Sequence, residues 1–297
     1  MNLRLEMLQV ARLAPKLLGD SAPLVEKFLR NEQAEAGGFK DRSGQSDLYY
    51  TVFGLDGLLA LQTQFPGDSV AEYLNRFGGG EKLDFIHLCC LARCWGTLQH
   101  ATSVRASGQI REQLQDQLNL HRSHDGGFNL LPDQPKGSVY AAFLAAGALG
   151  DLGAPILEPD RLVQSFRQLQ TRDGAWANDH HGKTGSTNAT AAAVVVLTNL
   201  GISLDQSVGD WLLARAHPEG GFVASPETPI PDLLSTATTL HALACLQRDI
   251  SGIRERCLDF VDSLWTNEGG FYGNWSEDKL DCEYTYYGLL ALGHLSV

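Results

Sequence analysis

A unit of about 48 residues recurs along the whole chain, and this repeat restricts the fold more than any other feature. Each copy has a Gly-rich turn that ends in an aromatic residue, and the visible aromatics are Phe39, Phe128, Trp176, Phe222 and Phe271. The first interval is about twice the others, and "FGGGEKLDFIHLCCLARCW" supplies a copy inside it, with Gly80 in place of the aromatic. The chain therefore contains six copies of one structural unit.

Each copy reads as a helix, the Gly-rich turn, a polar loop and a second helix. The first helices, such as "LVEKFLRNEQ", are charged on one face, whereas second helices such as "SVYAAFLAAGALG" are small and apolar nearly all round, as buried helices are. No segment shows sustained strand alternation. We therefore predict an all-α fold, an α/α toroid of six inner and six outer helices. Residues 21–297 form this single domain, and residues 1–20 add an extra N-terminal helix.

The residues around each turn have structural roles. The Gly pair lets the chain leave the outer helix through backbone angles closed to other residues, and the aromatic is expected to close the turn onto its neighbour. Each inner helix begins at a good N-cap residue, and these are Asp47, Asp84, Ser138, Ser186, Asp232 and Asp281. Because all inner helices begin at the same end, six N-termini face one mouth and favour an anion there.

Composition and charge exclude several classes of protein. The net charge of −12, from 23 Lys+Arg and 35 Asp+Glu, argues against unselective nucleic-acid binding. The opening "MNLRLEMLQVARLAPKLL" is interrupted by charges, so it predicts an amphipathic helix rather than a secretory signal. No apolar run approaches the roughly 18 residues of a membrane span. The six cysteines lie in apolar helical patterns without CxxC pairs, which predicts reduced core thiols in a cytoplasmic protein.

The repeat resembles a known superfamily. "QTRDGAW", Gln170 to Trp176, fits the Gln-x3-Gly-x-Trp repeat of squalene-type terpenoid cyclases. The "GGF…D…YT..GL..L" units resemble still more closely the β subunits of protein prenyltransferases, especially the Rab geranylgeranyl type, over nearly the whole chain from residue 21. The resemblance implies an α/α toroid whose central funnel holds an isoprenoid chain, with its diphosphate at the mouth. It also implies an α-subunit-like partner, because the resembled enzymes are heterodimers.

The resemblance does not extend to the family's zinc site. The family's ligands are an Asp and a Cys that open the fifth inner helix and a His that opens the sixth. Here Asp232 matches, but Leu234 stands at the Cys position and Tyr284 at the His position. Leucine cannot bind zinc and tyrosine does so rarely, so we expect no zinc there. At the positions of the family's diphosphate-binding Arg and Lys, this chain has Ser225 and, approximately, Thr228.

Large polar side chains gather instead in repeats six, one and two, which become neighbours when the ring closes. We expect the third residue after each cap to face the funnel, which places Tyr50, His87 and Tyr284 in a common cavity. Crowded carboxylates raise one another's pKa until one serves as a general acid, and Mg²⁺ would bridge them. The candidate catalytic residues are Asp281, Glu283, Tyr284, Tyr50, His87 and Asp84. The candidate ligand-binding residues are Arg42, Lys82, Lys279, Asp47 and Tyr49.

Three functions stay open on these residues. The first is a prenyltransferase β-subunit-like protein that handles an isoprenoid diphosphate through a rearranged site. The second is a lipid- or peptide-binding toroid without chemistry, and the third is a small terpenoid cyclase that uses the Asp/Glu cluster. His87, Cys90 and Cys94 share a helical stripe and could hold a metal, or His87 is a hydrogen-bonded wall residue. Lysines before four caps would suit a diphosphate, or are simply solvated.

Overall fold

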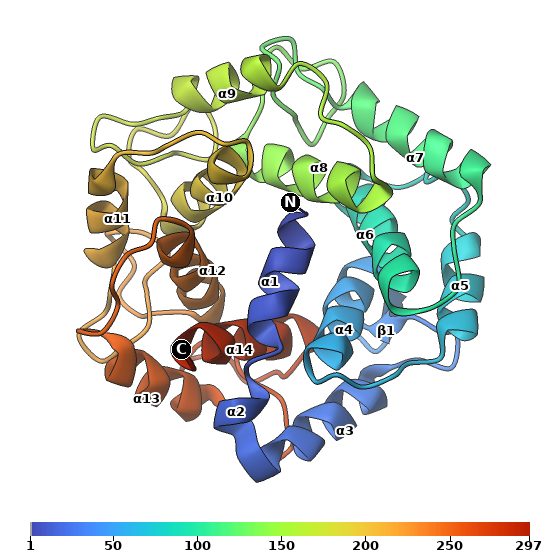
Figure 1. Ribbon diagram of the computed structural model, residues 1–297, viewed down its shortest axis with the longest axis horizontal. Helices are drawn as coiled ribbons and strands as arrows, with labels where there is room; N and C mark the ends of the chain where they lie inside the picture. Colours follow the sequence, from blue (N-terminus) through green and yellow to red (C-terminus); the bar gives the residue numbers. More distant parts are fainter. Residues whose placement is uncertain (1) are drawn as a thin grey trace.

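The helices form two concentric rings (Figure 1), as a computed structural model of residues 2–297 shows. The inner ring consists of α4 (Leu48–Ala60), α6 (Phe85–Ala101), α8 (Val139–Leu152), α10 (Thr187–Asn199), α12 (Leu233–Cys245) and α14 (Cys282–Leu295). The outer ring consists of α3 (Ala22–Glu32), α5 (Gly67–Asn75), α7 (Gly108–Leu120), α9 (Pro159–Gln168), α11 (Gln206–Leu213) and α13 (Arg254–Leu264). Consecutive inner helices are in contact and α14 contacts α4, so the ring closes. The predicted toroid is confirmed.

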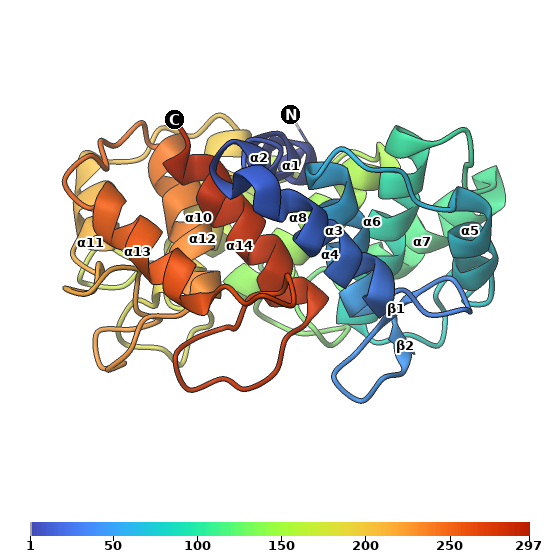
Figure 2. The ribbon, with the colours of Figure 1, turned by 90° about the horizontal axis from the view of Figure 1, so that it is seen from below.

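The N-terminal segment forms two helices where one was expected. These are α1 (Leu3–Ala11) and α2 (Pro15–Leu18), followed by a 3-10 turn at Gly19–Ser21. The second helix begins at Pro15, whose missing N–H is tolerated only in the first turn of a helix. Figures 1 and 2 show α1 lying across the ring, on the side where the inner helices end. It contacts α14, α4, α8 and α10, and it therefore covers this end of the ring.

All six predicted N-caps are confirmed, because each side chain accepts a hydrogen bond from a backbone N–H in the first turn of its helix. A threonine four residues after four of these caps completes the turn. In the first repeat the Thr51 hydroxyl accepts a hydrogen bond from the N–H of Phe39 at 2.9 Å, and it donates one to the carbonyl of Asp47. Thr190, Thr236 and Thr285 accept the corresponding bond in their repeats. The recurring Thr thus fixes the turn on its own inner helix.

The Gly pair and the aromatic serve close packing. Gly37 has φ of +98°, and a Cβ there would lie 2.1 Å from the carbonyl oxygen of Ser69 in the next outer helix. Only glycine therefore fits this position. The Phe39 ring packs on Gly54 of α4, in its own repeat. The strands β1 (Phe39–Lys40) and β2 (Ser46–Asp47) pair antiparallel and lead the chain into α4.

The remaining sequence expectations concern cysteines and membranes. All six cysteines are free, and five of them are buried, in keeping with the prediction of core thiols. Among residues 2–297, none of the helices combines the length and apolar character that crossing a membrane requires.

Candidate functional site

A central cavity of about 380 Å³ lies between the inner helices. It reaches from Asn178, beside the start of α8, and Ser186, at the start of α10, to Met7 on α1. Its walls are mostly apolar, and the aromatic members are Tyr49, Phe53, Tyr140, Phe143 and Tyr287. The volume falls within the roughly 300–1,000 Å³ typical of small-molecule sites. We call the end at the inner-helix N-termini the mouth and the end at α1 the closed end.

The cavity walls come largely from the second and sixth positions after the caps, and the second position lines the cavity in every repeat except that of Ile86. The sixth position lines the cavity in every repeat, with Phe53, Cys90, Leu144, Ala192, Thr238 and Tyr287. The prediction that the third position faces the cavity is wrong, because Tyr50, His87 and Tyr284 do not line it and only Ala189 of that set does. An error of one residue turns a helix by about 100°, which moves a side chain from the lumen to the side of its helix.

Glu283 and Tyr49 are the two predicted site residues that line the cavity. The Tyr49 hydroxyl donates a hydrogen bond of 2.6 Å to Glu283 Oε1. Burial raises the pKa of Glu283 to about 7, although the bond from Tyr49 opposes this shift. Burial also raises the pKa of Tyr49 far above its usual range, so its hydroxyl keeps its proton. The cavity wall therefore carries a carboxyl that exchanges its proton near neutral pH.

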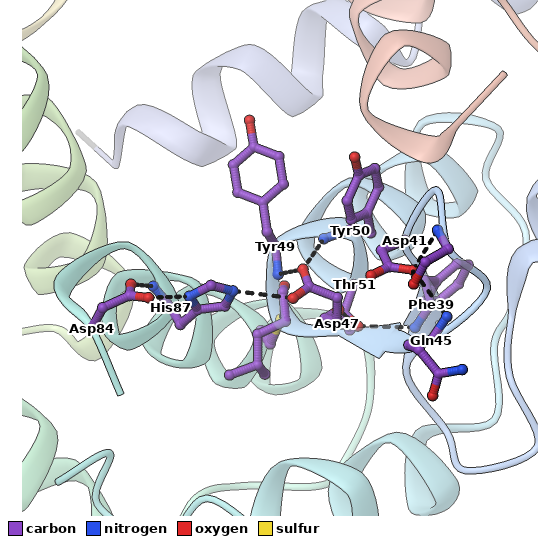
Figure 3. A network of polar contacts seen from close by, with 12 residues as sticks. Phe39, Asp41, Gln45, Asp47, Tyr49, Tyr50, Thr51, Asp84 and His87 are labelled. Atoms are coloured by element: carbon purple, nitrogen blue, oxygen red, sulfur yellow. Dashed lines mark hydrogen bonds and ion pairs between the residues drawn. The ribbon is translucent and has the colours of Figure 1, made fainter. Parts of the chain in front are cut away.

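Asp47, Asp84 and His87 form a chain across the starts of α4 and α6 (Figure 3). His87 Nε2 lies 3.0 Å from Asp47 Oδ2, and His87 Nδ1 lies 2.7 Å from Asp84 Oδ2. The hydrogen bond with Asp47 is the main cause that raises the pKa of His87 to about 9, with Asp84 adding to it. Burial would raise the pKa of Asp47, but the bond from His87 lowers it. The imidazolium is thus held between two carboxylates and ties two inner helices together.

Arg42 forms a second polar cluster at the start of α14. Its Nε lies 2.8 Å from Asp281 Oδ2 and its Nη1 lies 3.2 Å from Glu277 Oε2. The guanidinium also lies over the Tyr284 ring, 5.5 Å from the centroid. Burial raises the pKa of Asp281, and Arg42 opposes that shift. Arg42 is therefore paired with two carboxylates within the protein.

The structure thus separates the predicted residues into three groups. Tyr49 and Glu283 lie in the cavity wall. Asp47, Asp84 and His87 form one of the two clusters just described, and Arg42, Asp281 and Tyr284 belong to the other. Tyr50 meets Tyr49 edge to face, with ring centroids 5.6 Å apart, outside the cavity lining. Lys82 and Lys279 are exposed, and neither makes a hydrogen bond or an ion pair within residues 2–297. The predicted lysine fringe therefore consists of solvated side chains.

The family's zinc position has become part of the apolar wall. Leu234 lines the cavity, and the Asp232 carboxylate accepts hydrogen bonds from the N–H and hydroxyl of Ser235. Both ring nitrogens of His87 face aspartates, so the metal alternative with Cys90 and Cys94 is wrong. Across residues 2–297 there is no group of three His, Cys, Asp or Glu side chains placed to hold a metal ion.

Sequence reasoning missed a charged group at the closed end. Arg4 on α1 is paired with Asp151 on α8 at 2.8 Å and lies 3.6 Å from Asp56 on α4, while Arg93 on α6 lies 3.6 Å from Asp56. Arg93 also lines the cavity. Asp56, Arg93 and Asp151 are charged residues inside helices that the sequence predicts to be buried. Charged residues are rarely buried unless they are paired, so their positions could have indicated this group.

Fold and site together define a helical toroid with an apolar central cavity. Comparison with protein families places it further: the prenyltransferase alpha-alpha toroid domain matches residues 7–89, 81–209 and 202–296. The chain therefore belongs to the prenyltransferase alpha-alpha toroid family, as its repeats indicated. No curated protein matches the sequence.

Solved structures share the fold at low sequence identity. Candida albicans protein geranylgeranyltransferase-I, complexed with GGPP, aligns with a TM-score of 0.68 and 16% identity over 92% of this chain and 90% of its own. A variant of the type II terpene cyclase MstE from Scytonema, in complex with geranylgeranyl dihydroxybenzoate, aligns with a TM-score of 0.64 and 14% identity. The alignment covers 95% of this chain and 97% of the cyclase. The GH76A alpha-1,6-mannanase from a Salegentibacter species aligns with a TM-score of 0.60 and 12% identity, over 93% of this chain and 98% of the mannanase. Because these enzymes differ in substrate, the fold alone does not identify the ligand.

Proposed function

We propose that this protein binds the hydrocarbon chain of an isoprenoid in its central cavity. The observation that carries this proposal is the cavity itself, about 380 Å³ in volume and lined mainly by apolar and aromatic side chains. Burial of an apolar chain there contributes roughly 25 cal/mol per Å² of surface removed from water. The Candida transferase is complexed with GGPP and the Scytonema cyclase with geranylgeranyl dihydroxybenzoate, which supports the isoprenoid class.

Zinc-dependent prenyl transfer is not part of this proposal. The cavity has Leu234 where the resembled enzymes have a zinc-binding Cys, and Tyr284 stands at the position of their His. Neither side chain replaces the lost ligand. The diphosphate head group and an α-subunit-like partner stay predictions from the resemblance. Mg²⁺ stays a prediction from the acidic cluster, and a cytoplasmic location stays a prediction from the cysteine pattern.

Glu283 favours a second function, proton transfer to the bound isoprenoid. It lies in the cavity wall, and its raised pKa of about 7 keeps a substantial protonated fraction at neutral pH. A terpenoid cyclisation of this kind adds the carboxyl proton to an alkene carbon, and the resulting cation later returns a proton from another carbon. Tyr49 holds the carboxyl in place through its hydrogen bond of 2.6 Å.

Two measurements test these functions. Competition against a fluorescent geranyl probe should show that farnesol and geranylgeraniol bind, and that Ala192→Trp, which fills the cavity at the sixth position of its repeat, abolishes binding. A stable Ala192→Trp variant that binds as well as the parent would overturn the isoprenoid proposal.

For proton transfer, the protein is incubated with farnesol and geranylgeraniol in D₂O. Mass spectrometry should detect carbon-bound deuterium that depends on Glu283 and decreases as pH rises through about 7, because the carboxyl then loses its proton. Glu283→Gln keeps the size of the side chain but cannot donate a carboxyl proton. Unchanged deuterium incorporation in Glu283→Gln excludes this residue as the donor.

A further inference from the structure

The closed end of the cavity holds an arginine without hydrogen bonds. Arg93 carries five N–H donors, yet its only partner in residues 2–297 is Asp56 Oδ2, at 3.6 Å, which is beyond hydrogen-bond distance. Its side chain is 15% exposed and lines the cavity. A buried guanidinium normally has its donors satisfied, because an unpaired one costs free energy.

Other polar atoms of the same group also lack hydrogen bonds. Arg4 Nη1, Asp56 Oδ2 and Asp151 Oδ2 are buried and make no hydrogen bond within residues 2–297. Beside Arg4 and Arg93 there is a second, small cavity of about 10 Å³, which is about the space of one water molecule. One water molecule would fill this small cavity. The donors of Arg93 also reach the main cavity, where a ligand could bind them.

We propose that Arg93 is a ligand-binding residue that donates a hydrogen bond to an oxygen atom at the end of an otherwise apolar ligand. The polar end of the ligand then lies at the closed end, and its hydrocarbon chain extends toward the mouth. This inference rests on the proposed isoprenoid function and specifies the orientation and the end group. The resemblance to prenyltransferases predicts the opposite orientation, with the polar end at the mouth.

The charge of the group favours a neutral oxygen over an anion. Arg4 and Arg93 balance Asp56 and Asp151, so a carboxylate would add an uncompensated buried charge. A hydroxyl or carbonyl oxygen accepts a hydrogen bond from Arg93 without changing this balance. The structure therefore points to a prenyl alcohol, aldehyde or ketone as the ligand class.

The test compares farnesol with a hydrocarbon of the same skeleton in which a methyl group replaces the hydroxymethyl group. Both compete with the fluorescent geranyl probe on the full chain, and the ratio of their dissociation constants is taken for each variant. Transfer of each compound from water cancels when this ratio is compared between variants. We expect Arg93→Met to reduce the preference for farnesol about tenfold, since a hydrogen bond from a charged donor is lost.

Two variants separate this effect from unfolding and from the opposite orientation. The double variant Asp56→Asn with Arg93→Met removes the ion pair and should show the same reduced preference. Arg42→Met makes the matched change at the mouth and should leave the preference as in the parent. A preference unchanged in Arg93→Met, or reduced only in Arg42→Met, overturns the orientation while the isoprenoid proposal stands. Failure of both compounds to compete overturns the proposed function itself.

Farnesoic acid tests the charge argument. It should bind the parent protein more weakly than farnesol does, because its carboxylate adds an uncompensated charge to a balanced group. Tighter binding of farnesoic acid than of farnesol to the parent protein would overturn the choice of a neutral end group.

Discussion

The two ends of the central cavity use the same kinds of charged residue in opposite ways. At the mouth, Arg42 and His87 each contact two acidic side chains at 2.7–3.2 Å. At the closed end, only the Arg4–Asp151 pair is that short, and both contacts with Asp56 are 3.6 Å. The mouth is therefore a set of satisfied connections between helices, whereas the closed end keeps donors that a ligand can use.

This difference separates two uses of charge in one fold. The carboxylates of Asp47, Asp84 and Asp281 cap inner helices and bind cations with their remaining oxygens, so their clustering follows from ring closure. An acidic cluster that stabilises three neighbouring helix starts is not by itself a catalytic site. The residues that face the lumen, Glu283 and Arg93, are the ones available to a ligand.

The largest expected difference between the two ends is in stability. Arg4→Met leaves Asp151 without its buried ion-pair partner, and we expect the free energy of unfolding to decrease by about 3–5 kcal/mol. The matched change at the mouth, Arg42→Met, should decrease it by about 1 kcal/mol, because solvent screens that partly exposed pair. Urea denaturation measures both. Equal losses would show that the ends do not differ as argued.

The fold was predictable because each repeat carries its own local signals, such as the cap at Asp47 and the glycine at Gly37. The mouth clusters were also predictable as a neighbourhood, since repeat order alone brings Asp281, Asp47 and Asp84 together. The residues that face the lumen could not be predicted in this way, because side-chain direction depends on the rotation of each inner helix about its axis. That rotation is set by packing between rings, and one residue of error exchanged Glu283 for Tyr284. The closed end depends on where α1 docks, which no local pattern of the sequence specifies.

The pH dependence of stability above about pH 7 tests the mouth. The folded pKa of His87, about 9, is raised above the ordinary 6.5, so its contribution is fully present below about pH 6.5 and is lost as pH rises to 9. We expect the free energy of unfolding to fall by about 1–2 kcal/mol over this window, after allowing for solvent screening. Urea titrations at several pH values measure it, and His87→Gln should remove most of the slope.

His124 supplies the control for this experiment. It pairs with Asp133 in an exposed loop, at 2.9 Å, with both side chains well exposed. His124→Gln should leave the slope as in the parent, since an exposed pair contributes little. A slope that survives in His87→Gln, or that disappears in His124→Gln, would move the pH-sensitive group away from the mouth.

The smallest effect concerns the exposed lysines and the diphosphate. The double variant Lys82→Glu with Lys279→Glu should weaken the binding of farnesyl diphosphate several-fold if the mouth binds the anion. It should leave the affinity for farnesol nearly unchanged. The effect should shrink in high salt, since both lysines are in solvent. The carboxylates of the mouth oppose the same anion unless Mg²⁺ bridges them, so calorimetry is repeated with and without Mg²⁺. If the double variant changes neither ligand while Arg93→Met weakens farnesol, the polar end of the ligand lies at Arg93. If it weakens the diphosphate and Arg93→Met changes nothing, the mouth is the polar subsite and the orientation proposed from the closed end is wrong.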